Sequence, residues 1–388
     1  MQRKFTVCID PGHGGTKGSD FFREGQFGLR EEEVNVRVAL ALKKLLLEED
    51  IGVVLTREED KFIELQERVD IAREAEANIF ISIHHSVARD RSLNYSIVYF
   101  YKNAMGNPAS VDLASYLAYY FKKRLKLSAY VYSDHLVFSQ GFHVLRNLKD
   151  EIPAIIGEAS FLSHPQNELL LQREDFITKE AECYKEAIVE YFESGIPSYT
   201  LVSKDDDQDL IIELDDGFGG THFLDTSLRV IIDNKNVPYK LSVMKKLVAV
   251  ENKKQFGEGS HELILRGENR KNNSIHPKPF IFNNLSDGTE WKAYITSAKK
   301  FYSQACELHK NNNFEKVSHV ANQAIEALFH SLRILPVHEK VDEVYYYLVL
   351  SFHLINDTIH ADHYIKNLKN YTPTSEYIGK IDSSIIRD

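Results

Sequence analysis

The sequence predicts an α/β domain followed by a small all-β domain and an all-α segment. Three observations lead to this prediction. Strand-like apolar runs alternate with helical periods from Phe5 to Phe192, which indicates a mostly parallel sheet with helices on both faces. Short alternating runs separated by turn residues fill 210–285 and are typical of a β-sandwich. From Trp291 onward, apolar residues recur at helical spacing.

The elements of the first domain, 1–195, are expected in a regular alternation. The run 4–10 has apolar residues on both faces, which is typical of a buried strand, and the glycine-rich stretch 11–15 ends it. Further strands are expected at 51–56, 78–83, 94–101, 142–146 and 154–158. Helices are expected from Val34 to Leu46 and at 62–77, 111–125 and 175–192, where apolar residues follow the helical period.

The second half of the chain is expected to begin with a linker at 196–209. It contains Pro197 and the acidic run Asp205–Asp207 with Asp209. A calcium loop is the alternative for this run, but the glycine and terminal glutamate of an EF-hand are missing, so a solvated linker is favoured. After the sandwich, four helices are expected within 290–388, at 297–311, 314–335, 341–356 and 359–370.

Two weaker resemblances concern this second half. The segments 257–263 and 269–273 resemble the last hairpin of bacterial immunoglobulin-like modules. The helical segment resembles two tetratricopeptide-like units, although its period is not regular. Modules of both kinds bind partners or act as spacers between domains, so the helical segment is a candidate binding site for a protein partner.

Composition excludes several function classes. Lys and Arg total 47 and Asp and Glu total 57, so the net charge of −10 argues against a nucleic-acid partner. The three cysteines are far apart, which excludes a disulfide framework and a thiolate zinc cluster. No apolar run approaches the ~20 residues of a transmembrane span. The sequence from Met1 shows no secretory signal, so any export signal is expected to be missing from it.

Polar side chains that could hold a metal follow several of the expected strands. His13 follows the first strand, His84 the third, and Glu158 ends a later one, while Glu31 begins the first helix. Parallel strands bring their carboxyl ends to one edge. Two histidines and one carboxylate are the ligand count of an open catalytic zinc site, and a second carboxylate can act as general base. Each residue alone also has a structural explanation, such as a tight turn for His13 or a helix-dipole partner for Glu31.

The ordered set of motifs resembles the zinc-dependent N-acetylmuramoyl-L-alanine amidases, which cut stem peptides from bacterial peptidoglycan. Residues 7–15 read VCIDPGHGG and 28–35 read GLREEEVN. They are followed in family order by LTR at 55–57, by 65–68 and ISIH at 81–84, and by VLR at 144–146 and IIGEASFLS at 155–163. The resemblance covers 5–192 and implies an amidase fold, one zinc ion, and peptidoglycan as substrate. It implies His13, Glu31 and His84 as zinc ligands and Glu158 as the catalytic carboxylate.

The resemblance also implies roles for residues around the proposed ligands. Asp10 and Ser82 are expected to orient the ligands, and Arg68 and Arg146 to contact a peptide carboxylate, although Arg68 could equally be a helix-surface charge. His85 stands where the family has a small residue; it is a candidate substrate contact, with a supporting role or no role as alternatives.

The resemblance also implies where the protein acts and how it could differ from the family. The substrate implies an extracytoplasmic location, in the periplasm or cell envelope, with a role in wall remodelling or cell separation. Some members insert an inhibitory helix after the second histidine, but 86–140 is too short to hold it. A non-catalytic wall-binding scaffold and a zinc peptidase for another wall amide remain alternative functions.

Overall fold

The N-terminal half of the chain is built on a six-stranded sheet with the order β2-β1-β3-β6-β4-β5. The computed structural model describes residues 5–15, 23–203, 209–220, 222–224, 226–243, 246–257, 259–284, 290–334 and 340–385. All pairings in this sheet are parallel except that of β4 with β6. The strands are β1 (Thr6–Pro11), β2 (Gly52–Leu55), β3 (Ile79–Ser86), β4 (Ser96–Phe100), β5 (Ala129–Ser133) and β6 (Ala154–Phe161). The predicted, mostly parallel sheet is therefore confirmed.

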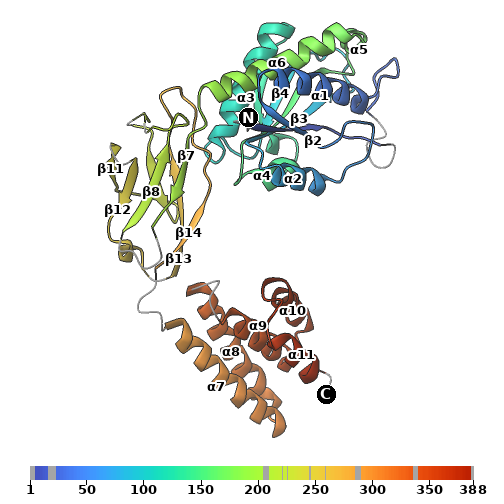
Figure 1. Ribbon diagram of the computed structural model, residues 1–388. Coiled ribbons are helices and arrows are strands. Elements are labelled where there is room, and N and C mark those ends of the chain that lie inside the picture. Colours follow the sequence, from blue (N-terminus) through green and yellow to red (C-terminus); the bar gives the residue numbers. More distant parts are fainter. Residues whose placement is uncertain are drawn as a thin grey trace. The chain divides into compact units, whose positions relative to one another are not determined.

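Helices cover both faces of this sheet, as the sequence predicts (Figure 1). One core joins α1 (Glu31–Glu48), α3 (Pro108–Tyr120) and α6 (Glu174–Glu193) to Val7 and Ile9 of β1. The other joins α2 (Leu65–Glu74) and α4 (His143–Leu148) to Cys8. Because β1 is covered on both sides, its residues are apolar without interruption from Val7 to Ile9. Short α5 (Pro165–Leu171), the π-helical turn Phe121–Leu125 and the 3₁₀ turn Asp134–Leu136 complete the domain.

One predicted strand of this domain is a helix. Residues 142–146 were expected to be extended, but His143–Leu148 form α4. Its buried side chains Val144, Leu145 and Leu148 have the i, i+1, i+4 spacing of one helix face. Six residues are too few to show that period unambiguously in the sequence.

The described residues between 198 and 284 carry eight strands in two four-stranded sheets, with the orders β10-β9-β13-β14 and β11-β12-β8-β7. The pairings β7–β8, β9–β10, β11–β12 and β13–β14 are antiparallel. The strands are β7 (Ser198–Leu201), β8 (Leu210–Asp215), β9 (Arg229–Ile232), β10 (Lys235–Val237), β11 (Lys240–Ser242), β12 (Leu247–Val250), β13 (Gly259–Arg266) and β14 (Phe280–Asn284). The expected linker thus contains strand β7, and its acidic run Asp205–Asp207 lies outside the described residues. The similarity of this segment to immunoglobulin-like modules stays a prediction.

The C-terminal segment is helical, as predicted. Its helices are α7 (Glu290–Lys310), α8 (Phe314–Ile334), α9 (Val341–Leu354), α10 (Thr358–Tyr371) and α11 (Tyr377–Ile385). The first four correspond to the expected helices, and α11 was not expected. Trp291, Ala298, Leu328 and Leu348 belong to their shared core. A tetratricopeptide-like arrangement remains a prediction.

By its internal contacts the chain divides into two compact units. One comprises Met1–Val202, Ile211–Ala249 and Ile264–Pro279, and the other Ser203–Leu210, Val250–Leu263 and Phe280–Asp388. The division into three domains at the boundaries expected from the sequence stays a proposal. Among the described residues, no helix is both long enough and apolar enough to cross a membrane.

Candidate active site

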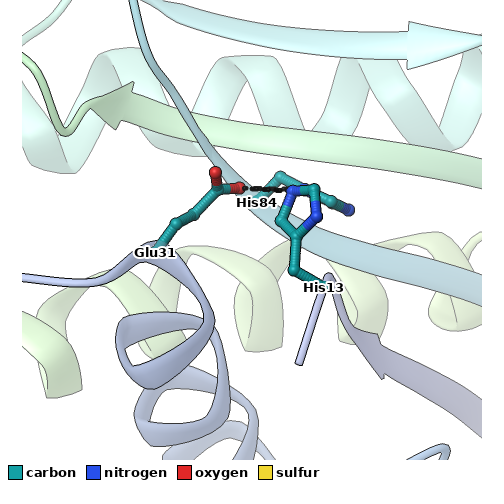
Figure 2. Close-up of side chains that lie close together, drawn as sticks. All are labelled: His13, Glu31 and His84. Atoms are coloured by element: carbon teal, nitrogen blue, oxygen red, sulfur yellow. Dashed lines mark hydrogen bonds and ion pairs between the residues drawn. The ribbon is translucent and has the colours of Figure 1, made fainter. Parts of the chain in front are cut away.

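Three side chains from distant parts of the sequence meet at the carboxyl edge of the six-stranded sheet (Figure 2). His13 follows β1, Glu31 is the first residue of α1, and His84 lies near the end of β3. One potential ligand atom from each lies within 4.8 Å of the others. Oε1 of Glu31 is 3.3 Å from Nε2 of His13 and 2.9 Å from Nδ1 of His84. The structure therefore brings together the three residues proposed as ligands.

The topology of the sheet explains this convergence. β1 and β3 are parallel neighbours with Pro11 opposite Ile83, so the residues after them emerge side by side. Gly12 allows the close approach, because a Cβ there would lie 2.0 Å from Nε2 of His84. His13 itself has a φ of 60°, in the left-handed region that non-glycine residues rarely adopt. Something else must therefore hold the loop in place.

Two buried arginines and an asparagine hold the carbonyl groups of this loop. Arg57 donates to the carbonyl oxygens of Pro11 (2.8 Å) and Gly12 (2.7 Å). Arg68 donates to the carbonyl oxygens of Pro11 (3.0 Å) and His13 (2.6 Å). Asn35 adds a bond of 3.1 Å to the Gly12 carbonyl oxygen. These bonds offset the backbone strain at His13 and fix where its ring points.

Arg68 therefore has a different place from the one expected. Its side chain is 4% exposed and pairs with Asp10 at 2.6 Å, so it is buried among the elements of the domain and not on a helix surface. Ser82 and Thr56 also donate to Asp10, each at 2.6 Å. Although burial favours the neutral acid, the charge of Arg68 and these hydroxyls hold the pKa of Asp10 below its ordinary value. Asp10 and Ser82 are thus linked to the His13 loop through Arg68, and their role in orienting the ligands stays a proposal. Arg68 also lines the cavity beside the cluster, so its contact with a peptide carboxylate stays a proposal too.

The charge states of Glu31 and His84 suit a metal site. Burial alone would raise the pKa of Glu31, but hydrogen bonds with His13 and His84 hold it well below its ordinary value. Burial lowers the pKa of His84, and the nearby His13 lowers it further. Oε2 of Glu31 is buried and has no hydrogen-bond partner. An ionised carboxylate with an oxygen that accepts no hydrogen bond, placed beside two imidazole rings, is a donor set that zinc binds.

Glu158 lies beside this cluster on the neighbouring strand. It is the register partner of His84 across β3 and β6. Burial raises the pKa of Glu158 to about 7, and the charge of Glu31 adds to the effect. The hydroxyl of Ser86 donates to Oε2 of Glu158 and opposes this rise. A carboxyl group that titrates near neutral pH can both accept and return a proton.

His85 does not reach the cavity as a substrate contact would. Its side chain is fully buried, with Nδ1 2.9 Å from Oδ1 of Asn35 and Nε2 3.1 Å from Oε2 of Glu180. Asn35 donates its amide hydrogen to Gly12, so its oxygen faces His85 and accepts from Nδ1. Burial opposes a charged ring, but Glu180 raises the pKa of His85. The backbone N–H of His85 also donates to Oε1 of Glu31 at 3.1 Å, which favours a supporting role over a substrate contact, and that role stays a proposal.

A cavity of about 360 Å³ opens beside the cluster. Its polar side carries His13, His84 and Glu158, and its other walls are largely apolar, with Phe62, Leu65, Phe138 and Phe142. Arg146 donates to the carbonyl oxygen of Gln140 near His143, which lines the cavity. Its contact with substrate stays a proposal. Residues 86–140 form β4, α3, β5 and short turns, and this leaves no room there for the inhibitory helix.

Several residues of this site were missed by sequence reasoning. Nη1 of Arg23 lies 2.5 Å from Nε2 of His13 and 3.6 Å from Oε2 of Glu31. Asn35 could have been found, because it stands four residues after Glu31 on the same face of α1. Arg57 lies in the LTR motif at 55–57 but was given no role. Arg23 and Glu180 carry no local signal, since each meets the site only through the tertiary fold.

Comparison with known proteins gives one consistent family. The profile of a family described as N-acetylmuramoyl-L-alanine amidase matches residues 7–190. The chain is 26% identical to the amidase AmiA of Escherichia coli, over 49% of this chain and 76% of that protein. It is 30% identical to the amidase LytC of Bacillus subtilis, over 48% of this chain and only 35% of that one.

Solved structures of the same kind also match. The catalytic domain of CwlV, an amidase from Bacillus (Paenibacillus) polymyxa, is 30% identical and has a TM-score of 0.42. The match covers 49% of this chain and 98% of that domain. Each of these matches therefore concerns about half of the chain.

Proposed function

Since this chain belongs to the N-acetylmuramoyl-L-alanine amidase family through residues 7–190, we propose that it hydrolyses peptidoglycan with a zinc ion held by His13, Glu31 and His84. The bond cleaved is the amide between N-acetylmuramic acid and the L-alanine of the stem peptide. The observation that supports this most directly is the meeting of three ligand atoms within 4.8 Å, beside Glu158. An intact set of this kind favours an enzyme over a non-catalytic scaffold.

In this proposal the metal and the protein residues have separate roles. Zinc supplies a Lewis acid, which polarises the scissile carbonyl and lowers the pKa of water. Glu158 accepts a proton from the attacking water and passes it to the leaving nitrogen of L-alanine. Its pKa of about 7 suits both transfers. Arg57, Arg68 and Asn35 keep His13 oriented by holding the carbonyl groups of its loop.

The setting of the reaction follows from its substrate. Peptidoglycan lies outside the cytoplasmic membrane, so we place the protein in the periplasm or cell envelope, in wall remodelling or cell separation. The helices α7–α11 are the part that we propose to bind a protein partner.

The test combines metal analysis with product identification. Purified protein should contain about one zinc per chain and release peptides with a new L-alanine N-terminus from whole peptidoglycan, as detected by mass spectrometry. Glu158→Gln should keep its zinc and lose at least 100-fold in turnover. Glu48→Gln, at an exposed position of α1, is the matched control and should behave as the wild type.

The alternative functions predict other results. A folded chain that neither binds zinc nor cleaves peptidoglycan would be a scaffold. New N-termini other than L-alanine would indicate a peptidase for a different wall amide. Near-full turnover of Glu158→Gln would refute the role of that carboxylate.

A further inference from the structure

The last strand of the six-stranded sheet presents two tyrosines to solvent. β5 ends the strand order, and its residues alternate between the two faces. Ala129 and Val131 pack against the core on one face. Tyr130 and Tyr132 lie on the other and are 43% and 39% exposed. Large aromatic side chains at this exposure are not needed to fill the core, so they are available for binding.

These tyrosines form an aromatic cluster with a fixed orientation. The rings of Tyr130 and Tyr132 are parallel to within 1°, with centroids 5.7 Å apart. Tyr95 meets Tyr130 edge-on at 5.6 Å, and Tyr95 is itself held by Phe161 at 4.7 Å. A binding surface whose side chains are already oriented loses little conformational entropy when a ligand arrives.

The register of the sheet relates this surface to Glu158. Ile97 of β4 is the partner of Glu158 on one side and of Tyr130 on the other. Residues directly opposite one another project from the same face of a sheet, so Glu158 and Tyr130 lie in one row on one face. Two strand spacings separate them, roughly 10 Å. Phe161, which holds Tyr95, is the partner of Ser86 and thus belongs to the same end of the sheet.

We propose that Tyr95, Tyr130 and Tyr132 form a subsite for the glycan strand, next to the sugar whose stem peptide is removed. This proposal rests on the proposed function. The C–H faces of pyranose rings pack on aromatic faces, and tyrosine adds a hydroxyl that can bond to a sugar hydroxyl. In polymeric peptidoglycan the glycan continues past each cleaved amide, so neighbouring sugars must lie against the protein. Two exposed tyrosines on the face of Glu158, with the half-buried Tyr95 beside them, are suited to receive these sugars.

The experiment separates glycan binding from catalysis by using two ligands and two substrates. Binding of peptide-free glycan strands is measured by calorimetry, and hydrolysis is followed on polymeric peptidoglycan and on a minimal N-acetylmuramoyl-peptide. The variant Tyr130→Ala/Tyr132→Ala removes the exposed rings. Tyr119→Ala is the matched control, because Tyr119 is an exposed tyrosine (55%) on helix α3.

We expect the double variant to bind the glycan about tenfold more weakly, since two stacking contacts are lost. The KM for polymeric peptidoglycan should rise by a similar factor, with kcat and all kinetics on the minimal substrate unchanged. Tyr119→Ala should match the wild type in every measurement. Unchanged glycan affinity and KM in the double variant, while the wild type is active, would overturn the subsite.

Two further outcomes have distinct meanings. If the wild type cleaves neither substrate but binds glycan through these tyrosines, the amidase function fails and the subsite stands. If the double variant changes only the sedimentation of the protein, the tyrosines serve contact between copies of the chain along β5, and the glycan subsite is refuted.

Discussion

The imidazole of His85 lies 3.1 Å from the carboxylate of Glu180, and both side chains are completely excluded from solvent. His85 lies in β3, directly after the proposed ligand His84, and Glu180 lies in α6, so their contact joins the two elements. Through Asn35 the same ring is linked to Gly12, and through its backbone to Glu31. One buried histidine thus contacts or neighbours the segments that carry all three proposed ligands.

Removing one partner of the His85–Glu180 pair should lower the free energy of unfolding. Glu180→Ala leaves a buried imidazole without its counter-charge, and we expect a loss of about 3–5 kcal/mol in the free energy of unfolding. Adding His85→Ala should recover part of that loss, because the unpaired group is then gone. Urea unfolding measures both. Glu182→Ala, on the same helix but 36% exposed, is the control and should cost less than about 1 kcal/mol. Equal losses for the two glutamates would refute the pair.

Metal removal should destabilise the protein. Oε2 of buried Glu31 has no hydrogen-bond partner, so a bound cation would offset the cost of its burial. A ligand at 1,000 times its Kd stabilises by about 4 kcal/mol, which corresponds to several degrees in Tm. We therefore expect chelation to lower the Tm and added Zn²⁺ to restore it, as followed by thermal unfolding. Glu31→Gln should show no such response, whereas His143→Ala, which lines the cavity outside the cluster, should keep it. A Tm that chelation leaves unchanged would argue against the metal site.

Arg68 should matter for stability and for metal binding, although it contacts only the backbone of one proposed ligand, His13. Arg68→Met leaves Asp10 buried and unpaired, which should cost about 3–5 kcal/mol. It also frees the His13 carbonyl, so zinc affinity should fall about 10- to 100-fold in a chelator competition assay. Arg73→Met, at a 39% exposed position of the same helix, is the control. Rescue of stability, but not of zinc affinity, by adding Asp10→Asn would separate the two effects.

The sequence allowed the meeting of four residues at one sheet edge to be predicted, because each stands at the end or start of an expected element. Their roles came from the family resemblance and stay proposals. His13 and His84 follow apolar strands, Glu31 starts a helix, and Glu158 ends a buried run. The roles of Arg68 and His85 could not be predicted in the same way. His85 and Glu180 are 95 positions apart and meet only after α6 has packed on the sheet. Whether a polar side chain next to a ligand faces the cavity or the core depends on this packing.

Ser86 should influence the pH at which kcat/KM falls on the acid side of its pH profile. Its hydroxyl donates to Glu158 and lowers the pKa of that carboxyl group. Without this bond the neutral acid is favoured, so Ser86→Ala should move the acid limb of kcat/KM to higher pH by about one unit. Ser115→Ala, whose hydroxyl only bonds to a carbonyl of its own helix, should leave the profile in place. A shift to lower pH would contradict the direction of this hydrogen bond.

The buried carboxyl group of Glu158 should make the metal-free protein less stable at alkaline pH. Burial raises its pKa from 4.5 to about 7, so the folded state holds the proton more tightly than the unfolded state. The stability contributed by this proton is present below about pH 4.5 and is lost as the pH rises through about 7. Glu158→Gln cannot ionise at this position. Its free energy of unfolding minus that of the wild type should therefore be larger at pH 8 than at pH 4, by on the order of 3 kcal/mol. Urea unfolding in the presence of a chelator measures the difference at the two pH values, and all other ionisable groups are the same in both proteins. If the difference is the same at pH 4 and pH 8, the pKa of Glu158 is not raised, and its proposed place as an acid and base near neutral pH is lost.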